Sequence, residues 1–212
     1  MDTISRKEKE RLAREQDIIN AAEKVFTVMS YNGASMEEIA KEAQFSRKTI
    51  YQYFTDKEDL LFVVIIRGFE RLLNTFKKAV ENGDNGYEKL KRLANAYYKF
   101  YKDSPNTLSL MNYIGYIKPT PENAEKRVEF NRISEQLAQE IAKVIDEGKA
   151  DGSIRKDVDT KSLTHSAEFM ITGFFHMLSI SGKTFVDHFS LNQEDFVTLN
   201  MNLLCDIFRA RK

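Results

Sequence analysis

The chain has 212 residues, of which 42% are hydrophobic, so it is long enough to bury a substantial core. Its 32 basic and 32 acidic residues balance, which excludes a protein that attracts nucleic acid through a strong overall positive charge. The sequence shows no signal-peptide pattern, no apolar run of about 20 residues that could cross a membrane, and one cysteine, Cys205, which excludes an intramolecular disulfide. We therefore expect a cytoplasmic protein without a membrane segment.

The first 30 residues combine a basic segment with an amphipathic helix. Residues 6–14 carry five basic and two acidic side chains, which could follow DNA phosphates or simply be solvated. Residues 17–30 are expected to form a helix, because their apolar residues recur on one face. These residues are Ile18, Ala22, Val25, Phe26 and Met29.

The stretch from Ser35 to Leu61 has the pattern of a helix-turn-helix. Ser35 and Glu38 form a capping box, and apolar residues then recur at helical spacing up to Ala43. Ser46 can cap a second helix from Arg47 to about Phe54, with Ile50 and Phe54 facing inward. A second capping box, Thr55 with Glu58, predicts a helix from Lys57 to about Val80. The first two of these helices would form a three-helix head together with the helix over 17–30.

The outward face of the second of these helices carries groups that can read DNA. Arg47, Lys48, Tyr51 and Gln52 share one solvent-facing stripe. Arginine can grip guanine with two hydrogen bonds, glutamine can pair with adenine, and tyrosine can contact a thymine methyl group or a phosphate. Lys57 lies at a helix N-terminus, where cation and free N–H groups both attract phosphate. The alternative is an ordinary helical hairpin with a charged surface.

This stretch resembles the N-terminal domain of the TetR family of bacterial transcriptional regulators. The resemblance covers about 50 residues, from Ile18 to beyond Leu61, and includes the pattern S-x-x-x-I-A-x-x-A from Ser35 and the motif Y-x-Y-F-x-x-K from Tyr51. It implies that Ser35, Tyr53 and Lys57 contact phosphates and that Tyr51 and Gln52 lie in a groove. The complete set assigned to DNA is Ser35, Ser46, Arg47, Lys48, Thr49, Tyr51, Gln52, Tyr53 and Lys57.

Two positions depart from the family pattern. Gln44 stands where the family has glycine, and a positive φ there would cost roughly 1 kcal/mol. Lys48 stands where a small residue is usual and adds a charge near DNA. The base preference therefore does not follow from the resemblance.

The rest of the chain predicts an all-α protein, with a DNA-binding head over residues 1–56 and a larger helical domain for effector binding and dimerisation over residues 57–212. Helices are expected over about 87–102, shortly after Pro105, and from about Pro121 to Gly148. A loop is expected over 150–159. The last two helices are expected over 160–181 and 193–210, with 182–190 as a connection.

The last helix has two apolar stripes and therefore needs two burying surfaces. One stripe contains Phe196, Leu199, Leu203 and Ile207, and the other contains Val197, Met201, Leu204 and Phe208. We assign the first stripe to a homodimer interface, as the resemblance implies. A central helix of a monomer is the alternative. A twofold dimer would place its recognition helices about 34–36 Å apart on a palindromic DNA operator.

Aromatic and sulfur-containing residues of the larger domain are candidates for the wall of an effector pocket, although such residues also make ordinary cores. The candidates are Tyr97, Tyr98, Tyr101, Met111, Tyr113, Tyr116, Phe130, His165, Phe169, Met170, Phe174 and Met177. No metal site or cofactor is expected, since His165 and His176 would lie about 16 Å apart along a helix.

Together these patterns predict a transcriptional regulator, a repressor that binds operator DNA as a homodimer and is released by a small apolar or aromatic effector. In the family's mechanism the effector tilts the fourth helix and changes the separation of the heads. Motifs of hydrolases, metalloproteases and nucleotide-binding enzymes are missing, so no catalysis is expected. The alternatives are an architectural DNA-binding protein without an effector, and a helical adaptor or enzyme with a degenerate head.

Overall fold

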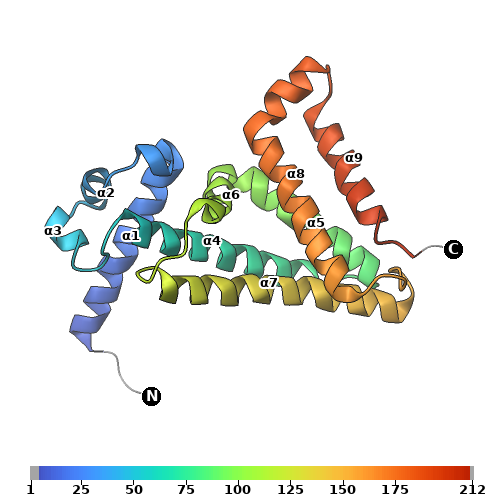
Figure 1. The fold of residues 1–212 in the computed structure, drawn as a ribbon, viewed down its shortest axis with the longest axis horizontal. Helices are drawn as coiled ribbons and strands as arrows, with labels where there is room; N and C mark the ends of the chain where they lie inside the picture. The colour runs from blue at the N-terminus through green and yellow to red at the C-terminus, as the bar shows by residue number, and fades with distance from the viewer. Residues whose placement is uncertain (1–4, 211–212) are drawn as a thin grey trace. The chain divides into compact units, whose positions relative to one another are not determined.

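The computed structural model describes residues 5–210, and this part of the chain is all-α, as the sequence predicts (Figure 1). Between residues 5 and 210 the only β-type pairing is an isolated bridge from Ile154 to Arg209. The helices are α1 (Arg6–Gly33), α2 (Met36–Ala43), α3 (Arg47–Ile50), α4 (Lys57–Ala79), α5 (Gly86–Asp103), α6 (Pro105–Asn112), the 3₁₀ helix η1 (Tyr113–Tyr116), α7 (Ala124–Asp151), α8 (Thr160–His188) and α9 (Gln193–Asp206).

The helices form two compact units that are not continuous in sequence. The first unit contains the chain up to Gly68 together with Asn106–Phe130, and the second contains Phe69–Pro105 and the chain from Asn131 onward. Helices α4 and α7 therefore contribute residues to both units. The sequence predicts a boundary after residue 56 between a DNA-binding domain and a domain for effector binding and dimerisation. This functional division stays a prediction.

Helix α1 is longer than the expected 17–30. The Ser5 hydroxyl accepts a hydrogen bond from the Glu8 backbone N–H and caps the helix, so the basic N-terminal residues form its first turns. Near the other end, Ser30 has φ 58° and ψ 168°, which interrupts the helical backbone. The last turn of α1 therefore takes a new direction and brings the Tyr31 ring to 5.9 Å from that of Phe26.

The helix-turn-helix follows the sequence pattern closely. Ser35 and Glu38 make the expected capping box at the start of α2. Gln44 ends α2 in the left-handed conformation, with φ 57°, at the position where the family has glycine. Ser46 caps α3 by accepting a hydrogen bond from the Thr49 N–H at 3.1 Å. Regular helix ends at Ile50, and hydrogen bonds from Gln52 and Tyr53 to residues three positions earlier continue the turns to Phe54.

The capping box predicted for α4 is wrong by one residue. The Asp56 carboxylate accepts the hydrogen bond of the Asp59 N–H, and Asp59 in turn accepts one from the Thr55 N–H at 2.9 Å. Asp56 and Asp59 thus accept the hydrogen bonds at the start of α4 that were expected of Thr55 and Glu58. Glu58 instead accepts a hydrogen bond from the Asn123 side-chain amide at 3.0 Å.

The segment from α6 to the start of α7 packs within the first unit. The Tyr113 ring lies 5.0 Å from that of Tyr31, and Met111 packs against Gly68, where a Cβ would lie 2.9 Å from its sulfur. Lys126 pairs with Asp59 at 2.5 Å. Residues 106–130 therefore cover the last turn of α1 and the beginning of α4.

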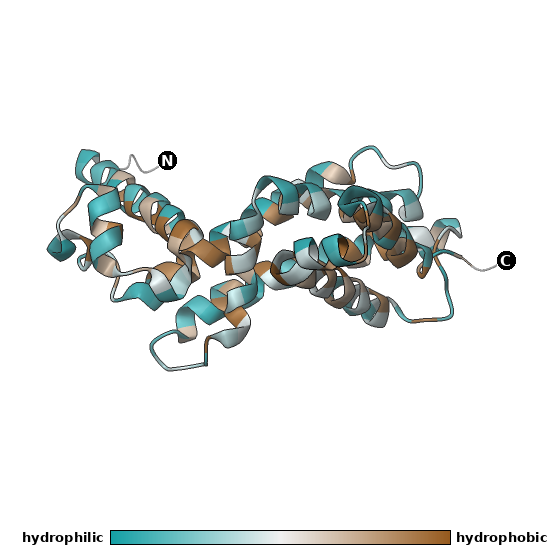
Figure 2. Ribbon diagram, turned by 90° about the horizontal axis from the view of Figure 1, so that it is seen from above, coloured by the Kyte–Doolittle hydropathy of each residue, from teal (hydrophilic) through white to brown (hydrophobic). Residues whose placement is uncertain are grey.

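The second unit is a helical bundle around α5, α7, α8 and α9, with hydrophobic residues concentrated on particular helix faces (Figure 2). Helices α5 and α7 meet at Gly86 and Gly148, where a Cβ on Gly86 would lie 2.2 Å from the Gly148 backbone. The expected connection over 182–190 is wrong, since α8 continues to His188. Gly182 lies inside this helix and is buried.

Across the described part of the chain, no helix has the length and apolar character needed to span a bilayer.

Candidate DNA interface and effector cavity

The second helix of the helix-turn-helix presents the predicted residues to solvent. Ile50 and Phe54 are buried, and this orientation leaves Arg47, Lys48 and Gln52 exposed. Tyr51 is 47% exposed, Ser46 is exposed and Thr49 and Tyr53 are partly so. The surface can therefore meet a DNA groove without any rearrangement of the core beneath it.

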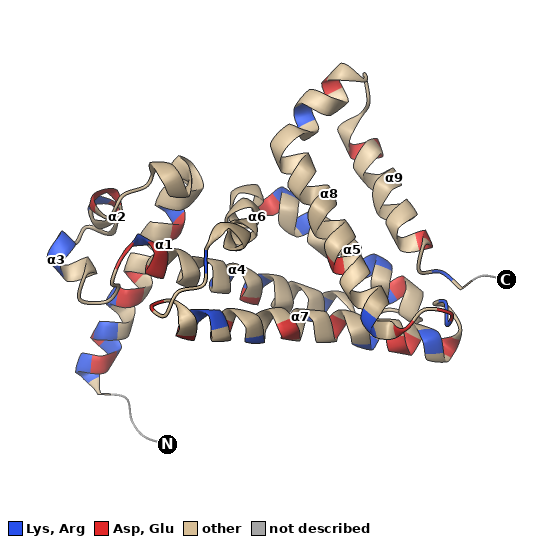
Figure 3. Ribbon diagram, viewed as in Figure 1, with Lys and Arg blue, Asp and Glu red and all other residues tan. Residues whose placement is uncertain are grey.

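Basic residues gather at two places in the first unit, on α3 and on the first turns of α1 (Figure 3). A groove joins the start of α1 to the end of the helix-turn-helix, and it is lined by Ser5, Lys7, Glu8, Glu10, Arg11, Arg14 and Tyr53. Tyr53 thus lies beside the basic segment. Exposed pairs, such as Arg6 with Glu10 at 3.0 Å and Arg11 with Glu8 at 3.0 Å, neutralise part of its charge. Such pairs are weak and can exchange for phosphates.

Two predicted phosphate contacts already hold the fold together. The Ser35 hydroxyl donates to the Glu38 carboxylate at 2.8 Å. The Lys57 ammonium donates to the backbone carbonyls of Tyr31 and Ala34 at 2.8 and 2.9 Å and lies 4.3 Å from the centre of the Tyr31 ring. Lys57 therefore links the start of α4 to the end of α1, a role that the sequence did not indicate. A phosphate contact by either residue stays a prediction.

The predicted effector residues divide between the two units. Met111, Tyr113, Tyr116 and Phe130 belong to the first unit, whereas the other eight belong to the second. Met111 is buried, Tyr113 packs on Tyr31, and Tyr116 is 70% exposed. The structure therefore does not gather the twelve residues around one cavity within either unit.

Three of the predicted tyrosines surround a phenylalanine that the sequence pattern did not single out. The rings of Tyr97, Tyr98 and Tyr101 lie 5.3, 5.8 and 5.0 Å from that of the fully buried Phe175. Burial raises the pKa of Tyr97 to about 12. These aromatic rings fill the space between α5 and α8, so they form part of the core.

The remaining predicted residues of α8 lie in different surroundings. Phe169 is 83% exposed, while Phe174 and Met177 line an apolar groove with Gly182, Phe185 and Phe196. The exposed His165 contacts the Glu168 carboxylate through Nδ1 at 2.8 Å. This pair has no third ligand, and the described residues contain no cluster of three His, Cys, Asp or Glu side chains that could hold a metal ion.

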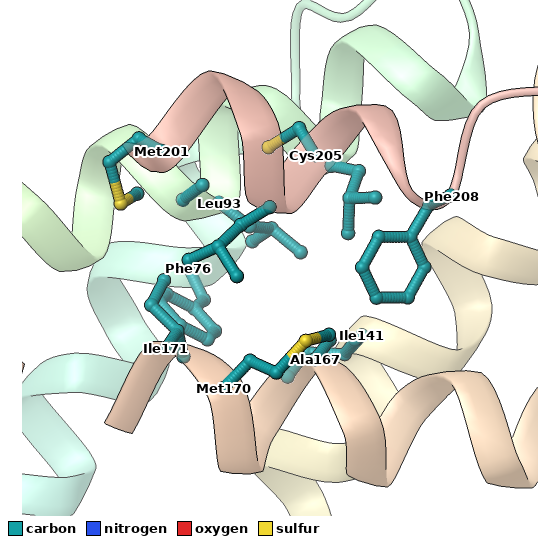
Figure 4. A pocket seen from close by; sticks show the side chains of 12 residues that line it. Phe76, Leu93, Ile141, Ala167, Met170, Ile171, Met201, Cys205 and Phe208 are labelled. Atoms are coloured by element: carbon teal, nitrogen blue, oxygen red, sulfur yellow. The ribbon is translucent and has the colours of Figure 1, made fainter. Parts of the chain in front are cut away.

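An apolar cavity of about 50 Å³, partly open to solvent, lies in the second unit, and of the twelve predicted residues only Met170 lines it. In Figure 4, Met201 and Cys205 project into it from α9, and Ala167 and Met170 face them from α8. The remaining lining residues come from α4, α5 and α7, from further positions on α8 and α9, and from the segment that follows α9. They are Phe76, Leu90, Leu93, Ala94, Ile141, Ile171, Leu204 and Phe208. The only sequence signal for this site was the second apolar stripe of the last helix.

The two stripes of α9 face in different directions, as their pattern requires. Val197, Met201 and Phe208 are buried, and Leu204 lines the cavity. Leu199, Leu203 and Ile207 are 56%, 55% and 48% exposed, and Phe196 is partly covered by Phe174 and Phe185. The stripe that we assigned to a dimer interface is therefore available for contact with another molecule.

Comparison with known proteins agrees with this geometry. Residues 18–64 match the family of bacterial regulatory proteins called the tetR family. The chain is 28% identical to the HTH-type transcriptional regulator HbdR of Aromatoleum sp. (strain CIB), over 94% of this chain and 82% of that protein. It is 22% identical to the fatty acid metabolism regulator protein of Bacillus subtilis (strain 168), over 72% of this chain and 77% of that protein.

The fold also matches solved structures along most of its length. The transcriptional regulator FadR from Bacillus subtilis, solved in complex with stearoyl-CoA, superposes with a TM-score of 0.69 and covers 90% of this chain and 97% of that one, at 19% identity. The match to residues 18–64 includes α2, the turn, α3 and the beginning of α4, which are the elements that present Arg47 and Tyr51. The chain belongs to the TetR family of bacterial transcriptional regulators.

Proposed function

We propose that this protein is a repressor that binds a palindromic DNA operator as a homodimer and leaves it when an apolar effector binds. The observation that carries the proposal is the outward presentation of Arg47, Tyr51 and Gln52 over the buried Ile50 and Phe54. A protein that binds a bacterial chromosome in this way works in the cytoplasm.

The recognition surface supports both base reading and positioning on the duplex. Arg47 and Gln52 can make paired hydrogen bonds to guanine and adenine in the major groove. Arg47 lies 3.9 Å from the Glu37 carboxylate, and both side chains are exposed, so this weak pair costs little to break. The basic first turns of α1 can contact phosphates beside Tyr53.

The exposed apolar stripe of α9 supports a homodimer. Leu199 and Leu203 lie on α9 and Ile207 directly follows it. Met177 and Ile180 on α8, and Phe189 just after it, add exposed apolar surface. Large contiguous exposed apolar patches are typical of association surfaces. A twofold axis through such a contact would present two copies of α3 to two half-sites of an operator.

The apolar walls of the second unit support an effector with an apolar group. The lining of the cavity has no charged side chain, and the FadR structure of similar fold holds stearoyl-CoA, whose acyl chain is apolar. An effector releases DNA only if it binds more tightly to the conformation that fits DNA poorly. The largest possible loss of DNA affinity equals that difference in effector affinity.

The test is binding of the purified protein to the DNA upstream of its own gene. Arg47→Ala and Tyr51→Ala should each lower the affinity at least tenfold, since a good base contact is worth about 1–3 kcal/mol. Lys99→Ala is the matched control, because Lys99 is an exposed basic residue on α5, outside the proposed DNA-binding surface. Wild-type affinity and sequence preference in both variants would contradict this recognition surface.

The effector is tested in the same DNA-binding assay by adding either stearoyl-CoA or coenzyme A. Loss of DNA binding with the first compound alone supports an effector recognised through its apolar chain. Similar affinity for many unrelated DNA sites, together with no release of DNA by apolar compounds, would instead indicate an architectural protein.

A further inference from the structure

We propose that Glu37, in the first turn of α2, reads a cytosine in the base pair next to the guanine that Arg47 contacts. The inference rests on the proposed DNA-binding function and adds a specificity-determining residue to it. Glu37 is not among the residues that the sequence assigns to DNA.

The other acidic residues of α2 hold the fold together, and Glu37 does not. The Glu38 carboxylate closes the capping box by accepting a hydrogen bond from the N-cap backbone N–H at 2.9 Å. Glu42 accepts one from the Lys24 ammonium of α1 at 2.5 Å. In the part of the chain that the structure describes, the only ion-pair partner of Glu37 is Arg47, at 3.9 Å. Beyond a favourable charge near the N-terminus of α2, the fold therefore gains little from this side chain.

Glu37 lies at the edge of the recognition surface. Its side chain is 79% exposed and that of Arg47 is 59% exposed. Figure 3 shows acidic residues of α2 next to the basic α3. Successive bases along one strand of DNA lie about 3.4 Å apart along the helix axis. Two side chains separated by 3.9 Å can therefore reach neighbouring base pairs.

DNA binding removes the one cation that faces Glu37. Arg47 can donate two hydrogen bonds to O6 and N7 of guanine, and its exposed pair with Glu37 is weak enough to break. The Glu37 carboxylate then lies near phosphates without a partner, which lowers the affinity because like charges repel. A base that donates a hydrogen bond to the carboxylate offsets this cost.

The four bases differ in what they offer to a carboxylate in the major groove. Guanine presents the acceptors N7 and O6, and thymine presents the acceptor O4 and a methyl group. Adenine presents an amino group beside the acceptor N7, whereas cytosine presents its N4 amino group without an acceptor. Glu37 therefore prefers cytosine, accepts adenine less well and rejects guanine and thymine.

The experiment selects bound sites from random DNA with the wild type, Arg47→Ala and Glu37→Gln. Arg47→Ala identifies the guanine, since the preference for this base should be lost there. At the neighbouring base pair, Glu37→Gln should lower the preference for cytosine over adenine at least fivefold, because glutamine pairs with adenine. Preferences at all other positions should stay. The matched control is Glu129→Gln, which makes the same charge change at an exposed position of α7 and should keep every preference.

Affinity measurements by fluorescence anisotropy separate base reading from a structural role. Glu37→Gln should bind unrelated DNA at least twofold more tightly, because a dimer loses two negative charges near phosphates. Glu37→Asp keeps the charge and should still reject guanine and thymine. If Glu37 served only to start α2, Glu37→Gln would weaken binding to all sequences alike.

The proposal is overturned if Glu37→Gln selects the same site as the wild type, or if it weakens binding to every sequence equally. The Glu37 side chain is exposed and outside the capping box, so Glu37→Gln should fold as the wild type does. Failure of the proposed function gives a different result. In that case the wild type selects no sequence, or Arg47→Ala changes none of its preferences, and both proposals fail.

Discussion

Single residues show where local sequence was sufficient to predict structure and where it was not. Ser35 and Ser46 cap their helices as expected, because a cap depends on residues only three positions apart. Gln44 adopts the strained left-handed conformation that the family pattern assigns to glycine. The interruption at Ser30 and the carbonyl contacts of Lys57 could not be predicted, because they depend on residues that are distant in sequence.

Replacement of Lys57 by methionine should lower the free energy of unfolding by about 2–3 kcal/mol. The change removes two charge-assisted hydrogen bonds and leaves the carbonyls of Tyr31 and Ala34 without this partner. Urea denaturation gives the value, and Lys41→Met, at an exposed position on α2, should change it by less than about 0.5 kcal/mol. Full stability of Lys57→Met combined with weaker DNA binding would show that Lys57 serves only as a phosphate contact.

At the level of helices, the sequence predicted which helices form better than it predicted where they begin and end. Apolar periodicity located α4 and α9, whereas proline, glycine and turn residues located α5 and α7. Gly182 looked like an end of α8 but lies inside it, because Gly182 is buried next to Leu178 and needs no turn. The effector residues were chosen by chemical type, and type alone cannot tell a core ring from a cavity wall. Only contacts between distant helices make that distinction.

The crossing of α5 and α7 provides a sharp test of packing. Gly86→Ala should destabilise the protein by about 3 kcal/mol, because the new Cβ would overlap the Gly148 backbone and the helices would have to separate. The matched control is Gly173→Ala on α8, where a Cβ meets nothing within 4 Å. That variant should gain about 0.5–1 kcal/mol from the higher helix propensity of alanine. Equal thermal midpoints for the two variants would contradict this description of the crossing.

For the molecule as a whole, a neutral chain must bind DNA through local charge. The 32 basic and 32 acidic residues cancel, and the basic groups of α3 and of the first turns of α1 provide the positive surface (Figure 3). The sequence suggested this segment and left open whether it was only solvated. Its helical structure and its position beside Tyr53 favour a role in phosphate binding.

Lys7→Ala should weaken binding to all DNA sequences alike and reduce its dependence on salt. Each phosphate contact contributes about 0.9 to the slope of log affinity against log salt concentration. A dimer loses two such contacts, so the slope should fall by about 2, as measured by fluorescence anisotropy over a series of salt concentrations. Lys99→Ala should leave the slope unchanged. An unchanged slope for Lys7→Ala would mean that the segment is only solvated.

The bonds from Lys57 to Tyr31 and Ala34 bring together the two places where the helix-turn-helix leaves and rejoins the rest of the chain. Residues 35–56 therefore form a loop whose base is closed independently of its own sequence. The exposed tip of this loop, which carries Arg47, Lys48 and Gln52, can change without loss of that closure. Related regulators could then acquire new operators by exchange of the tip of this loop, while the mechanism that senses the effector is inherited intact.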